Sequence, residues 1–209
     1  MCDSDNFNQW AESYDEDVDR SDQDDIFPFA GYKRVLERVG SLAGSRESGR
    51  LLDIGVGSGV LTARFYAAGW RVAALDFSEE MLKQARLRMP HADFFQCDFS
   101  KGLPPELTGN AFDVIVMTYA FHHLTHKQQP AFLRSLLQFL EPEGKILIGD
   151  IAFETQAAFE ACRKRFPGEW DEDEYYPILT ELRAQLPDLQ VKYEVISFCA
   201  GVIQICPRG

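Results

Sequence analysis

Three glycines alternate along one short stretch of this chain, at Gly55, Gly57 and Gly59. Glycine lets the backbone turn sharply and approach a ligand closely, because it has no Cβ atom. The stretch follows an apolar run at 51–54 and precedes a helical pattern that starts at Val60. A buried strand, a glycine turn and a helix N-terminus together make a binding site for a nucleotide-type cofactor.

Carboxylates stand at or near the ends of three successive predicted strands, at Asp53, Asp76 and Asp98. In an open parallel sheet, ligands bind beyond the carboxyl ends of the strands. Asp76 follows Gly55 at the distance where a carboxylate can bind both ribose hydroxyls. Asp98 could accept a hydrogen bond from an adenine amino group, with Phe99 beside the ring. Asp53 would repel a pyrophosphate, but it would suit the cationic methionine end of S-adenosylmethionine.

The glycine pattern departs from the dinucleotide-binding fingerprint, which has a Gly or Ala three residues after its second glycine. Val60 stands at that position, and Gly59 comes one residue too early. Together with Asp53, this spacing disfavours an NAD-dependent oxidoreductase, which stays as an alternative function.

Two adjacent histidines, His122 and His123, follow the fourth predicted strand at the expected mouth of the pocket. Their spacing differs from the i, i+4 spacing of a helical zinc pair. His126 has that spacing from His122, but no Cys or acidic partner accompanies it, so we expect no metal site. In one interpretation, one histidine packs in the core and the other caps a helix. In the other, His123 has a pKa near neutrality and acts as general base, assisted by Asp150 or Tyr119.

Apolar runs and helical patterns alternate over residues 50–150, which predicts a doubly wound α/β fold. We expect a seven-stranded, mostly parallel sheet with helices on both faces. The predicted strands are 51–54, 71–76, 92–98, 112–118, 145–150, 191–198 and 202–206, with a turn at 141–144 and a helix at 175–186. The last two strands are joined by so few residues that they must form an antiparallel hairpin.

Two segments stand outside this alternation, residues 1–30 and an insertion at 152–187. Both carry aromatic residues among acids, namely Phe7, Trp10, Tyr14, Phe166, Trp170, Tyr175 and Tyr176. Within a single domain spanning residues 1–209, we expect the first segment to be a lid and the insertion to form part of a substrate cap. Trp10 and Tyr14 either pack the lid onto the body or wall the cofactor. The charge run at 171–174 is expected to be a solvated face.

The 209 residues are 45% apolar and 26% charged, which is typical of a soluble globular protein. The sequence has no apolar run of about 18 residues and no signal-peptide pattern at its start. Five cysteines without a CxxC pair favour a reduced, cytoplasmic protein. The net charge is −12, and residues 1–25 hold ten acids and one base. We therefore expect no nucleic acid or membrane partner, but a small-molecule substrate and a monomer or homodimer.

Several stretches resemble the class I S-adenosylmethionine-dependent methyltransferases, which have a Rossmann-like fold. The matching stretches are Asp53-Ile-Gly-Val-Gly-Ser-Gly59, Leu75-Asp-Phe-Ser78, Gln96-Cys-Asp-Phe99, Phe112-Asp-Val-Ile-Val116 and Leu140-Glu-Pro-Glu-Gly-Lys145. The opening Trp10-Ala-Glu-Ser-Tyr-Asp15 looks like the leader of many small-molecule members, where such a Tyr approaches the methionine end of the cofactor. Residues 119–125 and 149–153 are most similar to small bacterial methyltransferases of unsettled substrate.

The resemblance implies S-adenosylmethionine as cofactor, S-adenosylhomocysteine as product and Gly55, Asp76 and Asp98 as cofactor-binding residues. With their neighbours, the expected cofactor site comprises Tyr14, Asp53, Gly55, Gly57, Gly59, Asp76, Phe77, Asp98, Phe99 and Thr118. The expected catalytic residues are His123, Tyr119 and Asp150. They would serve methyl transfer to a small molecule by in-line displacement. The alternative is a regulatory protein that binds the same cofactor without catalysis.

Overall fold

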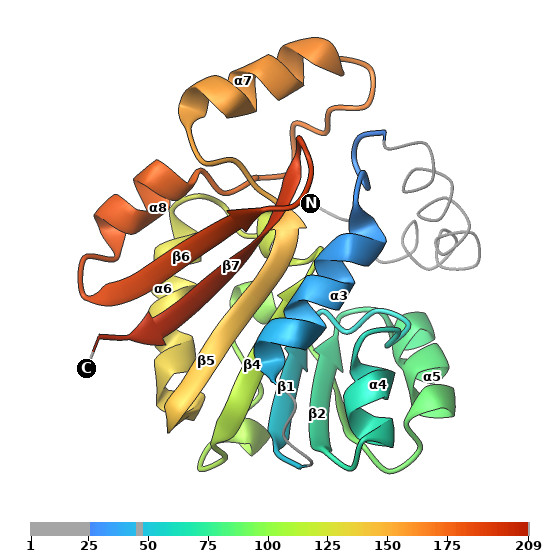
Figure 1. Cartoon of the computed structure of the whole chain (residues 1–209). Helices are drawn as coiled ribbons and strands as arrows, with labels where there is room; N and C mark the ends of the chain where they lie inside the picture. Colours follow the sequence, from blue (N-terminus) through green and yellow to red (C-terminus); the bar gives the residue numbers. More distant parts are fainter. Residues whose placement is uncertain (1–25, 45–47, 209) are drawn as a thin grey trace.

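The computed structural model describes residues 26–44 and 48–208, and these residues form a seven-stranded sheet flanked by helices (Figure 1). The strands are β1 (Arg50–Ile54), β2 (Arg71–Asp76), β3 (Asp93–Gln96), β4 (Phe112–Thr118), β5 (Leu140–Ile151), β6 (Leu189–Val195) and β7 (Ala200–Pro207). The helices are α3 (Tyr32–Ala43), α4 (Thr62–Ala67), α5 (Glu79–Arg88), α6 (Gln128–Leu136), α7 (Gln156–Arg165) and α8 (Leu179–Gln185). Short 3₁₀ turns are η1 (Phe99–Lys101), η2 (Pro105–Leu107), η3 (Phe121–His123) and η4 (Leu137–Phe139).

The sheet order is β3-β2-β1-β4-β5-β7-β6. In this order, all neighbouring strands from β3 through β2, β1 and β4 to β5 pair in parallel. Strand β7 is antiparallel to both β5 and β6. This topology confirms the predicted mostly parallel sheet with an antiparallel last strand. The strand order reverses between β1 and β4, and ligands bind at such a switch point, beyond the strand ends.

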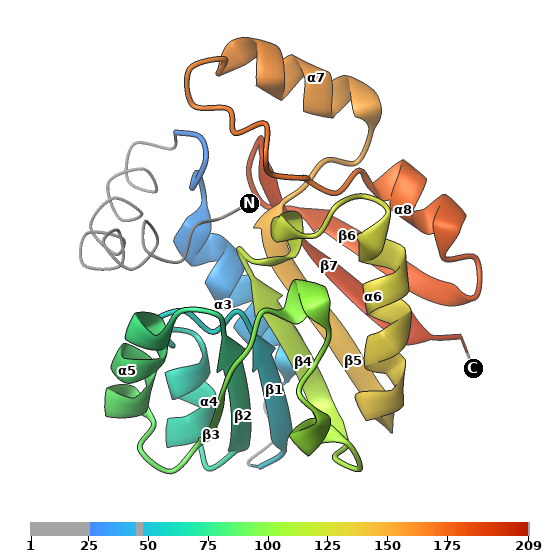
Figure 2. The same ribbon diagram turned by 180° about the vertical axis from the view of Figure 1, so that it is seen from behind.

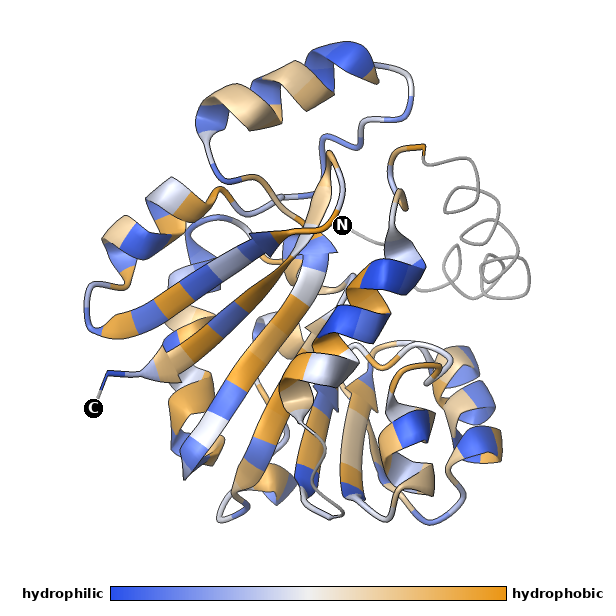
Figure 3. Cartoon of the chain, viewed as in Figure 1, coloured by the Kyte–Doolittle hydropathy of each residue, from blue (hydrophilic) through white to orange (hydrophobic). Residues whose placement is uncertain are grey.

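Helices cover both faces of the sheet, and the residues of each central strand point alternately into the two hydrophobic cores that this creates. On one face α3 packs against β4, β5 and β7 (Figure 1), burying Val35, Leu36, Val39, Val114, Val116 and Leu147 together. On the other face lie α6 and α8 (Figure 2), with Leu133, Leu136, Leu182, Ile115, Ile146 and Ile148. The central strands are mainly hydrophobic while the outer helices carry many hydrophilic residues (Figure 3). A sheet buried on both faces gives the site at its edge a rigid base.

The turn predicted at 141–144 is wrong, because β5 begins at Leu140 and runs through this stretch. Leu140 pairs with Phe112 and Lys145 pairs with Val114, so the register shifts between these pairs. The turn-like residues therefore form an irregularity inside the strand.

The helix predicted at 175–186 is shorter, because α8 begins only at Leu179. The preceding residues use their backbone groups for tertiary pairing. The Tyr175 N–H donates to the His122 carbonyl at 2.8 Å, and the Phe153 N–H donates to the Pro177 carbonyl at 3.0 Å. This pairing ties the insertion to η3 and to the end of β5.

The insertion at 152–187 carries α7 beyond the carboxyl end of β5 (Figure 1). Its aromatic rings pack on the first described residues of the chain, where Phe27 stacks on Phe166 at 5.6 Å and on Trp170 at 5.4 Å between centroids. Of the predicted lid at 1–30, residues 1–25 lie outside the described residues. None of the described helices combines the length and the apolar character needed to span a membrane.

Candidate functional site

The three positions of the loop require glycine for different structural reasons. All three have positive φ angles, of 75°, 54° and 80° for Gly55, Gly57 and Gly59. A Cβ on Gly55 would lie 2.5 Å from the Cβ of Ala120, and a Cβ on Gly59 would lie 2.9 Å from the side chain of Met89. Those two glycines permit close packing inside the protein. A Cβ on Gly57 would meet nothing within 4 Å, so the backbone there faces open space.

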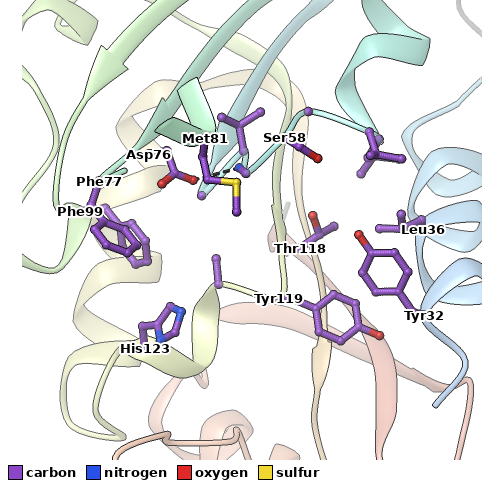
Figure 4. Close-up of a pocket in the computed structure, with 17 residues that line it drawn as sticks. Tyr32, Leu36, Ser58, Asp76, Phe77, Met81, Phe99, Thr118, Tyr119 and His123 are labelled. Atoms are coloured by element: carbon purple, nitrogen blue, oxygen red, sulfur yellow. Dashed lines mark hydrogen bonds between the residues drawn. The ribbon is translucent and has the colours of Figure 1, made fainter. Parts of the chain in front are cut away.

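A pocket of about 680 Å³, counting space open to solvent, lies against this loop. Figure 4 shows Asp76, Phe77 and Phe99 on one side of it and Tyr32, Thr118 and Tyr119 on the other, with His123 between them. Nine residues of the predicted site line it: Gly55, Gly57, Gly59, Asp76, Phe77, Phe99, Thr118, Tyr119 and His123. Asp53, Asp98 and Asp150 are not among its lining residues, and Tyr14 lies outside the described residues.

Asp76 ties the glycine loop to the end of β2. One carboxylate oxygen accepts the Gly57 N–H at 2.9 Å, and the other accepts the Ser78 N–H at 2.9 Å. Burial raises the pKa of this carboxyl group, although the hydrogen bonds from Ser78 and Gly57 oppose the rise. The carboxylate is therefore held in one orientation at the edge of the pocket.

Asp53 lies below the glycine loop and is almost fully buried. One of its oxygens accepts a hydrogen bond from the Thr62 hydroxyl, and the other has no hydrogen-bond partner among the described residues. Burial, opposed by the Thr62 hydrogen bond and aided by the charge of Asp76, raises the pKa of Asp53 to about 7. A buried carboxylate oxygen without a partner is costly unless a ligand group or a water satisfies it.

The raised pKa of Asp53 predicts a pH-dependent stability difference between the wild type and Asp53→Asn. A carboxyl pKa that folding raises destabilises the fold; the penalty is absent below the unfolded pKa of 3.8 and complete above about 7. Relative to the wild type, Asp53→Asn should therefore gain on the order of 2 kcal/mol in unfolding free energy between about pH 4.5 and 8. Urea denaturation of the cofactor-free proteins across this range measures it. A difference that stays constant with pH would contradict the assignment.

Asp98 is engaged in capping its own turn. Its carboxylate accepts hydrogen bonds from the Ser100 N–H and hydroxyl, and it forms an ion pair with Lys101 at 2.8 Å. Burial raises the pKa of Asp98, but the bonds from Lys101 and Ser100 together outweigh it and lower the pKa. Its neighbour Phe99 lines the pocket, whereas the predicted contact between Asp98 and adenine stays a prediction.

Asp150 does not assist His123 as expected, because its hydrogen-bond partner is His122. The His122 Nδ1 atom lies 2.6 Å from one carboxylate oxygen, and the other oxygen accepts the backbone N–H groups of Phe121 and His122. Asp150 and His122 are both buried, so this pair supports η3 from below the pocket. The adjacent residues His122 and His123 thus have different environments, because His122 is buried against Asp150 and His123 lines the pocket.

The pKa values of the two histidines move in opposite directions. Burial, and then the charge of His122, lowers the pKa of His123 to about 4, which corrects the expected value near neutrality. Burial alone would lower the pKa of His122, but Asp150 and Glu174 outweigh it and raise the pKa to about 10. His123 is therefore a neutral imidazole at the pocket.

Glu174 belongs to this site, although the charge run at 171–174 predicted a solvated face. One of its oxygens lies 3.4 Å from His122 Nε2, and the other accepts a hydrogen bond from the Tyr176 hydroxyl at 2.5 Å. Burial raises the pKa of Glu174, but the bond and charge of His122 outweigh it and lower the pKa to about 2. The two tyrosines directly after the acidic run were the signal in the sequence that this acid turns inward.

An aromatic wall on the α3 side of the pocket was missed by the sequence analysis. The ring of Tyr119 lies 4.9 Å from that of Tyr32 and 5.5 Å from that of Phe29. Tyr119 has a φ of 51°, which is uncommon for a residue other than glycine and often marks a functional site. The left-handed backbone turns the chain at the end of β4, where the pocket begins.

Comparisons with known proteins agree with this fold and pocket. A family model described as a methyltransferase domain matches residues 51–144. An uncharacterized methyltransferase of Geobacillus kaustophilus is 38% identical over 185 residues, covering 84% of this chain and 82% of the relative. One of Alkaliphilus oremlandii is 32% identical over 179 residues, covering 86% and 79%.

Solved structures share the fold at low sequence identity. A structure of DhpI in complex with SAH has a TM-score of 0.71 at 18% identity and covers 98% of this chain and 94% of that one. Magnesium protoporphyrin IX methyltransferase from Synechocystis with bound SAH has a TM-score of 0.69 at 16% identity and covers 99% and 100%. The fold and the glycine-loop pocket define an α/β methyltransferase. The chain belongs to the class I S-adenosylmethionine-dependent methyltransferases, together with uncharacterized members from Geobacillus and Alkaliphilus.

Proposed function

We propose that this methyltransferase binds S-adenosylmethionine in the pocket at the glycine loop and transfers its methyl group to a small-molecule acceptor. The observation that carries the proposal is the loop itself, where Gly57 leaves its backbone open to the pocket and Asp76 holds that backbone in place. Calorimetric titration with S-adenosylmethionine and with NAD tests the cofactor. Heat of binding with NAD alone would overturn the proposal and favour the oxidoreductase alternative.

The residues present fit this cofactor along the length of the pocket. We assign the Asp76 carboxylate to the ribose hydroxyls and the rings of Phe77 and Phe99 to the adenine, since all three residues line the same side of the pocket. The unpartnered oxygen of Asp53 supports a role toward the cationic methionine end, directly or through a water, and Thr118 lines the opposite wall. We further propose that Asp98 contacts the adenine amino group and that Tyr14 contacts the methionine end of the cofactor.

The cofactor supplies a methyl group on a sulfonium, and the protein's part in an in-line displacement is mainly positioning. Holding an acceptor atom about 3 Å from the methyl carbon can supply much of the acceleration. The neutral imidazole of His123 borders the pocket and is the group we assign to the acceptor's proton, with Tyr119 shaping the same wall. We assign Asp150 an indirect role, in which it positions η3, and with it His123, through its hydrogen bonds with His122.

The charge of the chain and one structural neighbour support a small acceptor. The net charge of −12 disfavours nucleic acid and anionic membranes and suits a neutral or cationic acceptor. The related magnesium protoporphyrin IX methyltransferase is named for a small-molecule substrate. No disulfide joins the described cysteines, which supports the proposed cytoplasmic setting.

Two glycine substitutions are expected to have different effects. Gly57→Ala should weaken S-adenosylmethionine binding by about tenfold or more, because the new methyl group enters the open space against the pocket. Gly55→Ala should instead lower stability by about 2 kcal/mol or more, because its Cβ meets Ala120 at 2.5 Å. Calorimetry and thermal unfolding of both variants separate the two effects. Full cofactor affinity in Gly57→Ala would argue against a cofactor at this loop.

We also propose that residues 1–30 and the insertion at 152–187 close over the pocket as a lid and substrate cap. The stacking of Phe27 on Phe166 and Trp170 supports coupling between the two segments. Hydrogen exchange should show residues 7–18 and 156–176 gaining protection when S-adenosylhomocysteine binds, because lids come from the least stable parts of a structure. Equal exchange with and without this ligand would mean that the segments are no lid.

A further inference from the structure

A cluster of two histidines and a glutamate lies directly behind the pocket, and it extends the site beyond the cofactor. One ligand-type atom from each of His122, His123 and Glu174 lies within 4.8 Å of the others. The histidines come from η3 after β4, whereas Glu174 comes from the insertion, so the fold brings together residues far apart in the sequence. Two imidazoles and one carboxylate are a ligand set for divalent transition metals such as zinc and iron.

His122 and Glu174 form a long ion pair, and its length is also that between two ligands of one ion. His122 Nε2 lies 3.4 Å from the Glu174 oxygen. A charge-assisted hydrogen bond between these groups would have a length of about 2.7–2.9 Å. Two ligands of a tetrahedral zinc ion, each bonded at about 2.0–2.1 Å, lie about 3.3 Å apart. The observed separation is therefore close to that of two ligands bonded to one ion.

The groups around the cluster already have the arrangement that metal ligands require. One oxygen of Asp150 accepts two backbone N–H groups, and its other oxygen lies 2.6 Å from His122 Nδ1, which points Nε2 toward Glu174. The second oxygen of Glu174 accepts the Tyr176 hydroxyl. A carboxylate behind a ligand histidine and a hydrogen bond behind a ligand carboxylate are common features of metal sites, where they fix ligand orientation.

We propose that His122 Nε2, one ring nitrogen of His123 and the Glu174 carboxylate bind a divalent transition-metal ion. The ion would take the place of the proton on His122 Nε2. Because His123 lines the pocket (Figure 4), a coordination position of the ion would be directed toward the acceptor. The preferred acceptor would then carry an oxygen or nitrogen atom that can coordinate the ion.

This inference depends on the proposed function only at His123, which has a role in both proposals. The lone pair of His123 that would take the acceptor's proton binds the ion instead. The ion would polarise the acceptor as a Lewis acid, so that the acceptor loses its proton to water before it attacks the methyl group. Metal binding is measured without cofactor or acceptor, so its failure leaves the methyltransferase proposal intact with His123 as the base.

Titration of the chelator-treated full-length chain with Co²⁺ tests the site, because tetrahedral Co²⁺ with nitrogen and oxygen ligands has intense visible absorption bands. We expect one ion per chain, these bands, and displacement of Co²⁺ by Zn²⁺. Glu174→Gln should weaken Co²⁺ binding by at least about tenfold. Two matched controls, Glu172→Gln in the same acidic run and His91→Ala at an exposed histidine, should bind as the wild type does.

The opposite results are equally clear. Absence of Co²⁺ bands in the folded wild type, or wild-type affinity in Glu174→Gln, would overturn the metal site. An equal loss of binding in His91→Ala would also overturn it, because the ion would then be held on the surface. Circular dichroism of each variant establishes that it is folded, and Tyr176→Phe gives a second variant whose affinity should fall while all three ligands remain.

Discussion

An Asp76→Ala variant is expected to bind S-adenosylmethionine about 10- to 150-fold more weakly than the wild type, a loss of about 1.5–3 kcal/mol. In the proposed site the carboxylate accepts charge-assisted hydrogen bonds from the ribose, and in the structure it accepts the Gly57 N–H. Its removal therefore takes away direct contacts and loosens the loop that faces the cofactor. Calorimetric titration of the purified variant measures the loss.

The control separates a local effect from a general one. Asp93→Ala removes an exposed carboxylate at the opposite end of the neighbouring strand and should leave affinity unchanged. Asp76→Asn keeps the shape and one acceptor oxygen, so its affinity should lie between those of the wild type and Asp76→Ala. A folded Asp76→Ala protein with wild-type affinity would remove Asp76 from the cofactor site.

The second large effect is expected at His123, where an alanine should lower turnover by about 100-fold or more. The imidazole borders the pocket and its pKa of about 4 keeps it neutral, which is the form that can take an acceptor proton or bind a metal ion. Affinity for S-adenosylmethionine should stay within about twofold of the wild type, because we assign His123 to the acceptor and not to the cofactor. Single-turnover kinetics and calorimetry measure the two quantities separately.

His91→Ala serves as the matched variant, since His91 is exposed and far along the chain from the pocket. Its turnover should equal that of the wild type. Unchanged turnover in a folded His123→Ala protein would mean that this histidine only packs. Addition of Zn²⁺ to the wild type and to His123→Ala then distinguishes a base from a metal ligand. Only a ligand role of His123 makes the wild-type rate depend on the ion.

Local sequence patterns were sufficient for the sheet and for the loop, because both depend on residues close together in the sequence. The alternation of apolar runs and helices predicted the parallel strands, and the short link between β6 and β7 required them to be antiparallel. The residues chosen from this spacing, Gly55, Gly57 and Asp76, line one pocket, whereas their contacts with the cofactor stay a prediction. Strand-end residues of neighbouring parallel strands necessarily meet at one edge of the sheet.

The parts that the sequence did not reveal depend on contacts between distant segments. Glu174 was taken for a solvated acid, yet the insertion turns it toward His122, more than fifty positions earlier in the sequence. Asp150 was paired with the wrong one of two adjacent histidines, because a pattern cannot tell which of them faces inward. The helix predicted from Tyr175 onward was too long, since backbone pairing with η3 and β5 competes with helix formation.

The most direct test of the proposed function follows a labelled methyl group from S-adenosylmethionine into a cell extract divided into a small-molecule filtrate and a macromolecular fraction. The account predicts that the wild-type protein transfers the label into the filtrate and releases S-adenosylhomocysteine, and that Asp76→Ala does so far more slowly at limiting cofactor. Label in protein or nucleic acid alone would contradict the small-molecule acceptor. Tight cofactor binding with no transfer into either fraction would favour the regulatory alternative.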